Sequence, residues 1–408
     1  NEKLFARIKA LYNKRESLQL DAESLKLLEN YYEDFLIAGA NLSTTDKETL
    51  KKYNSELASL ETDFNQTLLE GSLAAAQTIN GKKVAIVNTT QQPLLSELAD
   101  RNQRKQLFEA AWNRTDGGAH NTNDILKRIA LLRAKKAELL GFKNYAEWSL
   151  QRTMAKTPAA IAQFFKDLVP ASVGKAKTEA KEIQSQIAKT GGNFSLEPYD
   201  WNFYAEQVRK AKYDLDENEI KPYFELKNAL ENGVFYAATK LYGLTFKERK
   251  DIPVYHPDVL VYELFEEDGT PLGLFYGDFF ARESKRGGAW MSNFVNQSKL
   301  LGTKPVIYNV CNYVKPTDGK PALLTYDELT TLFHEFGHAL HGFFANQQYA
   351  SLSGTAVARD FVEFPSQFNE HWALYPDILK NYAVHYQTKQ PIPQALIDKI
   401  KKASTFNE

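Results

Sequence analysis

Two histidines four residues apart, His334 and His338, enclose Glu335 in an H-E-x-x-H pattern that can hold a metal ion. On a helix, residues four apart lie one above the other on one face, so both imidazoles can share a tetrahedral zinc ion. Glu335 follows the first histidine directly, where its carboxylate can act on a water molecule without binding the metal. These three residues predict a zinc peptidase site.

A helix must carry this pattern, and its start is well marked. Thr325 followed three residues later by Glu328 is typical of a capping box at a helix N-terminus. A broad apolar face follows and would bury the helix; its members are Leu329, Leu332, Phe333, Phe336, Leu340 and Phe343. We therefore expect the histidines to stand on a rigid support.

A catalytic zinc site needs a third protein ligand and an open fourth position. The extended pattern, with a glycine three and a histidine six residues after His338, fails because those positions hold His341 and Phe344. Glu363, 25 residues after His338, is the strongest candidate for the third ligand. Asp360, about one helical turn before Glu363, suits the orientation of a ligand imidazole, and it is the alternative third ligand.

Three neighbours of these residues need an interpretation. His341 is expected to be a core or supporting histidine, because a fourth protein ligand would close the catalytic position. Pro365 cannot donate a backbone hydrogen bond, so a second helix either starts near Glu363 or bends there. Gln367, one turn after Glu363, would lie on the same face of that helix.

The chain resembles the thimet oligopeptidase family of zinc metallopeptidases, and within it most closely the bacterial peptidyl-dipeptidases, or dipeptidyl carboxypeptidases. The matching stretches are residues 278–291, 305–312, the H-E-x-x-H helix, 351–355, 359–367 and 369–372, with weaker similarity at 137–145 and 199–204. By this resemblance His334, His338 and Glu363 bind one Zn²⁺ per chain, and Glu335 is the general base.

The resemblance implies hydrolysis of short, unstructured peptides in a deep channel between helical walls, with release of C-terminal dipeptides. Relatives carry a tyrosine- and glycine-rich segment with a histidine well beyond the third ligand, whereas this sequence stops 45 residues after Glu363. We therefore expect the 408 residues to be an internal piece of a longer enzyme that lacks both ends. Two alternatives stay open: an endo-acting oligopeptidase, and a non-catalytic zinc-binding helical module that binds peptides.

Release of a dipeptide requires a basic group that recognises the terminal carboxylate of the substrate. Arg359 is the first candidate, because it precedes Glu363 by four residues, about one turn if both are helical. Arg282, Lys285 and Arg286 are further candidates, and the required group can also lie outside this sequence.

Length and composition limit the class of protein. A chain of 408 residues exceeds what one compact core usually holds, so we expect two subdomains or one elongated helical body. The expected fold class is mainly α, an elongated helical body with a small β-sheet beside the zinc helix. The expected domains are a helical domain at 1–250 and a zinc-binding catalytic domain at 251–408, incomplete at its C-terminus. The net charge of −1 does not indicate nucleic acid or a membrane as a partner. The family resemblance implies short peptides as partners, and we expect a monomer.

The sequence offers little evidence on compartment. Its single cysteine, Cys311, cannot form an internal disulfide, and no apolar run approaches the roughly 18 residues of a membrane span. The chain begins at Asn1 without an initiator methionine or signal peptide, so we expect that a leading portion is missing. We predict a cytoplasmic location, with the periplasm as the alternative.

Periodicity predicts the remaining elements. Residues 3–70 are expected to be helical, with Ser43 as an N-cap and a seam from Leu50 to Leu68 that packs against the segment around Leu25 to Phe35 as a hairpin. Three further helices are predicted: one at 123–140, a second from 157 toward 189, and a third that ends near Tyr242. A hairpin is predicted at Asn80-Gly81, and strands at 259–265, 272–280 and 305–310. Residues 349–353 are predicted to be an edge strand beside the metal or a plain buried strand.

Overall fold

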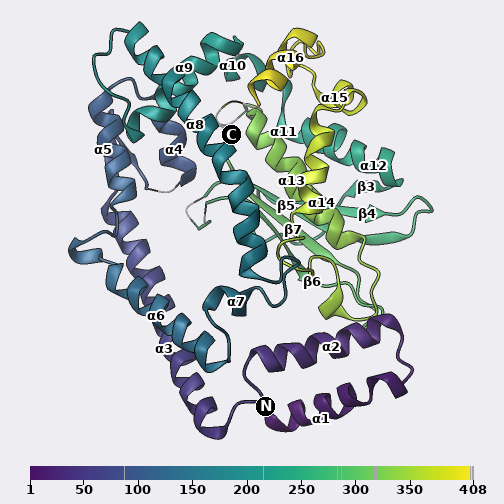
Figure 1. Ribbon diagram of the computed structural model, residues 1–408. Coiled ribbons are helices and arrows are strands. Elements are labelled where there is room, and N and C mark those ends of the chain that lie inside the picture. The colour runs from purple at the N-terminus through teal and green to yellow at the C-terminus, as the bar shows by residue number, and fades with distance from the viewer. Residues whose placement is uncertain are drawn as a thin grey trace. The chain divides into compact units, whose positions relative to one another are not determined.

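The computed structural model describes residues 1–86, 88–214, 216–282, 284–285, 287–316, 319–404 and 406. It divides into two compact units, Asn1–Glu206 and Gln207–Glu408. The first unit is helical apart from one short hairpin, and the second combines helices with a five-stranded sheet (Figure 1). This confirms the mainly α fold with a small sheet beside the H-E-x-x-H helix. The predicted functional division at residue 250 stays a prediction.

The first unit is built from helices of very different lengths. They are α1 (Glu2–Asn13), η1 (Arg15–Ser17), α2 (Ala22–Ile37), α3 (Thr44–Ala74), α4 (Asn88–Glu97), α5 (Arg101–Trp112), η2 (Gly118–His120), α6 (Asn123–Leu139), α7 (Tyr145–Ser149), α8 (Pro158–Lys189), η3 (Pro198–Asp200) and α9 (Trp201–Tyr213), which continues into the second unit. Strands β1 (Gln77–Ile79) and β2 (Lys82–Val84) pair around Asn80 and Gly81, both at positive φ, so the predicted hairpin is confirmed.

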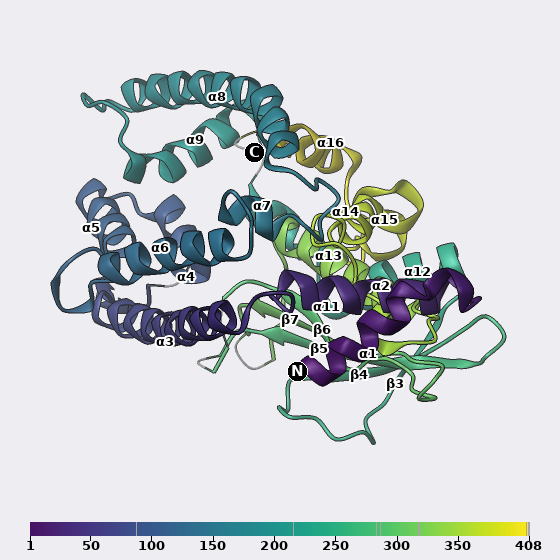
Figure 2. The same cartoon turned by 60° about the horizontal axis from the view of Figure 1, so that its bottom comes forward.

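The helix pairing in the first unit differs from the prediction. Ser43 caps α3 as expected, but the apolar seam of α3 packs against α6, where Leu57, Ile129 and Leu132 form a buried cluster. Helix α2 instead pairs with α1, with Phe5 stacked on Phe35 at 5.5 Å between ring centroids. Figure 2 shows α3 beside α6 and α1 beside α2. The predicted hairpin of α2 with α3 is wrong, because the apolar period of a helix marks a packing face without specifying its partner.

The sheet of the second unit has the order β3-β4-β5-β7-β6. Its strands are β3 (Thr245–Glu248), β4 (Leu260–Phe265), β5 (Pro271–Phe280), β6 (Trp290–Val295) and β7 (Val306–Tyr313). Only β5 and β7 pair in parallel; the other neighbours are antiparallel. The strands predicted near β4, β5 and β7 are confirmed, whereas β3 and β6 were not predicted. Strand β6 thus forms one edge of the sheet.

The expected strand at 349–353 is wrong in both of its versions. Ala350–Leu352 forms a 3-10 helix, η6, because local hydrogen bonds from Leu352 N to Tyr349 O and from Ser353 N to Ala350 O close tight turns. The edge strands of this sheet are β3 and β6, both from earlier parts of the chain.

The second unit also contains further helices. They are α10 (Glu217–Ile220), η4 (Lys221–Tyr223), α11 (Leu226–Asn228), η5 (Ala229–Phe235), α12 (Tyr236–Tyr242), α13 (Tyr326–Phe343), α14 (Phe364–Glu370), η7 (His371–Leu374), α15 (Pro376–Tyr382) and α16 (Gln394–Ala403). Helix α13 packs its apolar face on the sheet, in a core shared by Phe275, Ile307, Phe333 and Phe336. Among the helices of the described residues, none is both long and apolar enough to cross a membrane.

Candidate metal centre

Helix α13 carries the H-E-x-x-H pattern and starts as predicted. The Thr325 hydroxyl accepts from the Glu328 backbone N–H at 3.0 Å, and the Glu328 carboxylate accepts from the Thr325 N–H at 2.8 Å. This reciprocal pair is the predicted capping box, and it satisfies two backbone donors that a helix start would leave unpaired. The predicted apolar face of α13 is buried, so the site stands on a fixed element.

The structure brings His334, His338 and Glu363 together. Oε2 of Glu363 lies 3.2 Å from Nε2 of His334 and 3.1 Å from Nε2 of His338, and the three possible ligand atoms all lie within 4.8 Å of one another. Two ligands on a tetrahedral zinc ion are separated by about 3.3 Å, given zinc–ligand distances of about 2.0 to 2.1 Å. Two imidazoles and one carboxylate at this spacing fit a zinc ion.

Helix α14 places Glu363 beside the histidines. Of the two predicted alternatives at Pro365, the first is found: α14 starts at Phe364, directly after Glu363, and the proline occupies its first turn, where no backbone donor is needed. The helix packs closely on α13, because a Cβ on Gly337 would lie 2.7 Å from the Cα of Ser366. Asn369 also donates to the backbone carbonyl of Phe333 at 2.7 Å, so α14 is tied to the H-E-x-x-H helix.

The carboxylate that orients His334 is Glu370. Its Oε1 lies 2.6 Å from Nδ1 of His334, so a histidine that faces a metal through Nε2 donates its Nδ1–H to Glu370. The prediction that Asp360 orients a ligand histidine is wrong, because Glu370 is the partner of Nδ1 of His334, and the buried Nδ1 of His338 has no hydrogen-bond partner among the described residues. Glu370 follows Glu363 by seven residues, which is two turns of one helix, so the two side chains lie on the same face. This spacing is the feature of the sequence that could have indicated Glu370.

Glu335 is buried beside the triad, with 5% of its surface exposed. Within the described residues, its Oε2 has no hydrogen-bond partner. Burial raises the pKa of Glu335 to about 7; the charge of His334 opposes this shift and the charge of Glu363 adds to it. A carboxylate with a free oxygen and a pKa near neutrality is suited to accept and return a proton.

His341 lies one turn beyond His338 and is not part of the triad that the described residues form. Its ring packs near the Phe361 ring at 6.4 Å between centroids, and burial lowers the pKa of His341. The packing of His341 against Phe361 agrees with the expectation of a core or supporting histidine.

The predicted carboxylate-binding cations have different surroundings. Arg282 and Lys285 both bind Asp278, at 2.7 and 3.1 Å, and are therefore engaged within the protein. Arg286 lies outside the described residues. Arg359 is exposed and forms no ion pair with the residues that the structure describes. Of the three described candidates, Arg359 is the one available to a substrate.

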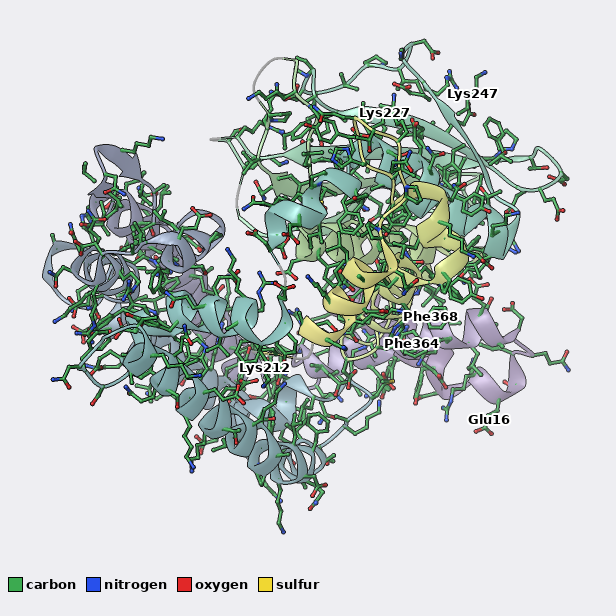
Figure 3. All side chains as sticks on the ribbon, turned by 90° about the horizontal axis from the view of Figure 1, so that it is seen from above. Glu16, Lys212, Lys227, Lys247, Phe364 and Phe368 are labelled. Carbon is green, nitrogen blue, oxygen red and sulfur yellow. The ribbon has the colours of Figure 1, made fainter. Side chains whose placement is uncertain are left out.

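Two surfaces formed by α14 and by the neighbour of α13, strand β6, were not predicted. Helix α14 exposes Phe364 and Phe368, with 64% and 48% of their surfaces accessible, and Figure 3 labels both rings on this helix. Strand β6 lies near the C-terminal part of α13, since a Cβ on Gly342 would lie 2.8 Å from the Cε of Met291. In the described sheet, the outer edge of β6 pairs with no further strand, so its backbone groups can bind an extended chain.

The family model described as Peptidase family M3 matches residues 94–408, more than half of the chain. The chain belongs to this peptidase family. Membership in the M3 family implies a metal ion, and the triad of His334, His338 and Glu363, next to the unpaired Oε2 of Glu335, is a donor set that fits one.

Curated relatives of this M3 chain are peptidases. The dipeptidyl carboxypeptidases of Escherichia coli (strain K12) and Salmonella typhimurium (strain LT2) are 50% and 49% identical over 436 residues, which cover all of this chain and 64% of each relative. Oligopeptidase A of Escherichia coli (strain K12) is 32% identical over 422 residues, which cover 95% of this chain and 62% of that protein. The chain thus spans less than two thirds of the length of these relatives.

Proposed function

We propose that this M3 chain belongs to a zinc-dependent peptidase that hydrolyses short peptides and releases dipeptides from their C-termini. The observation that carries the proposal is the convergence of His334, His338 and Glu363, with the buried carboxylate of Glu335 beside them. The similarity to two dipeptidyl carboxypeptidases supports the dipeptide product. We further propose one zinc ion per chain, a monomer and a cytoplasmic location, with the periplasm as the alternative.

In this proposal, His334, His338 and Glu363 would hold the zinc ion. The chemistry that zinc supplies at such a site is Lewis acidity, which polarises a peptide carbonyl and acidifies water. Glu335 accepts a proton from the attacking water at its unpaired Oε2 and returns it to the leaving amine. Glu370 keeps the His334 ring in one tautomer and one orientation.

The surroundings of the triad support an extended peptide as the substrate. The free edge of β6 can pair with the substrate main chain, and the exposed rings of Phe364 and Phe368 can contact its side chains. We propose that the exposed guanidinium of Arg359 binds the terminal carboxylate, because a planar guanidinium binds a carboxylate through two hydrogen bonds.

A second candidate is an endo-acting oligopeptidase, which the 32% identity to an oligopeptidase A favours. The two functions differ in what they require of the substrate's C-terminus. A dipeptidyl carboxypeptidase cuts two residues from a free C-terminus and does so poorly on a C-terminal amide. An endopeptidase accepts both peptides.

Mass spectrometry of the products from a hexapeptide and its C-terminal amide, with the full-length natural protein, tests this proposal. We expect dipeptides from the free peptide, little product from the amide, and a raised KM for the free peptide alone in Arg359→Ala. Internal cleavage of both peptides would support the endopeptidase. Stoichiometric zinc with no cleavage of either peptide would instead support a non-catalytic zinc-binding module.

A further inference from the structure

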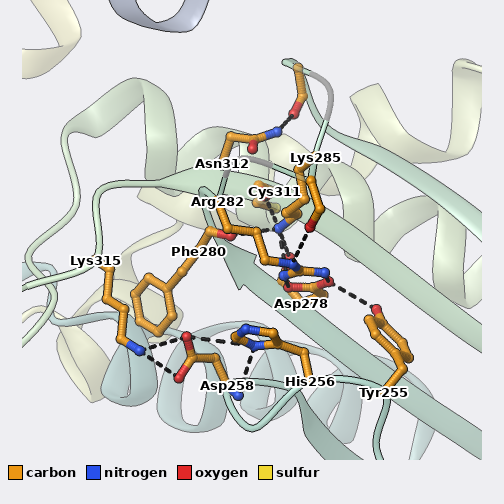
Figure 4. A network of polar contacts seen from close by, with 12 residues as sticks. Tyr255, His256, Asp258, Asp278, Phe280, Arg282, Lys285, Cys311, Asn312 and Lys315 are labelled. Atoms are coloured by element: carbon orange, nitrogen blue, oxygen red, sulfur yellow. Dashed lines mark hydrogen bonds and ion pairs between the residues drawn. The ribbon is translucent and has the colours of Figure 1, made fainter.

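A buried group of charges lies where β5 and β7 end (Figure 4). The Lys285 side chain is 4% exposed, and its Nζ donates to Oδ1 of Asp278 and to the backbone carbonyls of Asp278, Phe280 and Cys311 at distances of 2.5 to 3.1 Å. Arg282 binds the same carboxylate through two hydrogen bonds of 2.7 Å each. Two cations therefore hold one buried carboxylate.

The ammonium group meets the sheet at an irregular point. The register of the parallel β5–β7 pair shifts between Asp278 and Phe280, and such a shift disrupts the regular hydrogen-bond ladder. Lys285 donates to the carbonyls of Asp278 and Phe280, one on each side of the shift in β5. It also donates to the carbonyl of Cys311 in β7. Burial lowers the pKa of Lys285, and Asp278 opposes that effect. Lys285 therefore joins the ends of the two strands.

The same group is connected to the start of β6. Asn312, at the end of β7, donates from its side chain to the Gly288 carbonyl at 2.7 Å. Two residues later β6 begins, with Trp290 opposite Val310. The segment before β6 is thus attached to β5 and β7 through Arg282, Lys285 and Gly288.

We propose that Lys285 and Asp278 are positioning residues that set the register of edge strand β6, and thereby align the main chain with which an extended peptide pairs. This inference rests on the proposed peptidase function. A slip of one residue turns every side chain and backbone group of a strand to the opposite side, so the start of β6 must be fixed. Stability alone does not require this arrangement, since apolar side chains often replace buried ion pairs without loss.

Kinetics of Lys285→Met and Asp278→Asn in the full-length natural protein test the proposal. Lys315→Met is the matched control, because Lys315 also pairs with an aspartate in this region, Asp258, but with a side chain that is 56% exposed. We expect the two variants to raise KM about tenfold, with zinc content unchanged and kcat within about threefold, and the control to change neither constant. Measurements at a temperature where circular dichroism shows each variant folded exclude unfolding as the cause.

A peptide with one backbone N-methyl group, moved along the sequence around the scissile bond, separates positioning from general stability. Methylation removes one main-chain donor, so at the position that pairs with β6 it should raise KM in the wild-type protein. In Lys285→Met and Asp278→Asn this methylation penalty should shrink, because β6 is no longer in register. Equal penalties in wild type and both variants would overturn the inference. A zinc-loaded wild type that cleaves no peptide would instead refute the proposed function.

Discussion

His334 is contacted on both ring nitrogens by carboxylates, Glu363 at Nε2 and Glu370 at Nδ1. A neutral imidazole carries one proton, and Glu370 selects the tautomer with that proton on Nδ1. The lone pair on Nε2 is then directed toward Glu363 and toward the position of a metal. His338 has no such carboxylate on its Nδ1 within the described residues, so we expect the two histidines to contribute unequally to the proposed metal site.

Substitution of Glu370 by glutamine should weaken zinc binding by about 10- to 100-fold without abolishing it, because the charged acceptor of His334 is lost. Competition with a chelator of known affinity measures the change in Kd. His334→Ala and Glu363→Ala, which remove ligands, should retain no zinc. Asp360→Asn is the control and should leave the Kd of zinc unchanged. A Kd that changes in Asp360→Asn but not in Glu370→Gln would show that the two acids have been assigned in the wrong order.

Glu335→Gln should stabilise the metal-free protein in a pH-dependent way. Burial raises the pKa of Glu335 from 4.5 to about 7, so below pH 4.5 its carboxyl is protonated in both the folded and unfolded states and adds no cost. Above pH 7 it is ionised in both states, and its burial then costs the folded state up to about 3 kcal/mol. The variant should gain this stability near pH 8 and lose the gain as the pH falls.

Urea denaturation with excess chelator, at several pH values, measures this gain. With zinc bound, the positive ion favours the ionised carboxylate, and the difference between Glu335→Gln and wild type should decrease. A gain of the same size at every pH would mean that ionisation of Glu335 is not its source. In the full-length natural protein, Glu335→Gln should also keep its zinc and lose peptidase activity.

At the scale of elements, two glycines of α13 give the helix different neighbours. A Cβ on Gly337 would lie 2.7 Å from the Cα of Ser366 and 3.1 Å from the carbonyl oxygen of Pro365, so α14 itself would have to move. A Cβ on Gly342 would meet the ends of two side chains, Ile307 and Met291, which can adjust. Replacing either glycine by alanine favours the helix by about 1 kcal/mol, because alanine has the higher helix propensity. A difference in stability between the two variants therefore reports the difference in packing.

Gly337→Ala should therefore lower the free energy of unfolding by about 1 to 3 kcal/mol and weaken zinc binding, because α14 carries Glu363. Gly342→Ala is the matched variant and should lose less stability and keep its zinc affinity. Thermal unfolding with and without zinc measures both effects. Equal losses in the two variants would show that close contact of α13 with α14 is not what holds Glu363.

Sequence patterns predicted the local elements of this site and missed the long-range ones. The H-E-x-x-H spacing, the capping box at Thr325 and the proline after Glu363 act within a few residues, and each has its expected structure. Strand β6 was missed because an edge strand is not buried on alternate residues, and its residues show no apolar period of two. The partner of α3 depends on how helices pack, which periodicity does not specify. The spacing of Glu370 from Glu363 is visible in the sequence, but it does not show that Glu370 meets His334 where α14 packs on α13.

At the scale of the whole molecule, the metal triad and its supporting core lie within one compact unit. The core cluster around α13 contains residues from Ile220 to Ala403, and the three triad residues lie between them in sequence. Glu370 and strand β6 belong to the same unit, Gln207–Glu408. The residues that we propose as metal ligands, and the core that supports them, therefore lie inside the second unit.

A fragment that begins at Trp201, so that α9 stays intact, should fold cooperatively and bind one zinc ion. Thermal unfolding followed by circular dichroism and elemental analysis of the dialysed fragment measure these properties. The same fragment with His338→Ala is the control for adventitious zinc. A fragment without a cooperative transition, or with no more zinc than the control, would show that the first unit is required to form the site.

Helix α14 has only seven residues, yet it touches His334 from both ends, with Glu363 just before its first residue and Glu370 as its last. A short helix moves as one rigid body, so any tilt or slide of α14 displaces both carboxylates together. In the proposed zinc site, the strength of the metal bond and the orientation of the imidazole are therefore mechanically coupled. A substitution that shifts this helix cannot improve one of them independently of the other, which leaves the chain few ways to retune its metal affinity except by replacing the ligands.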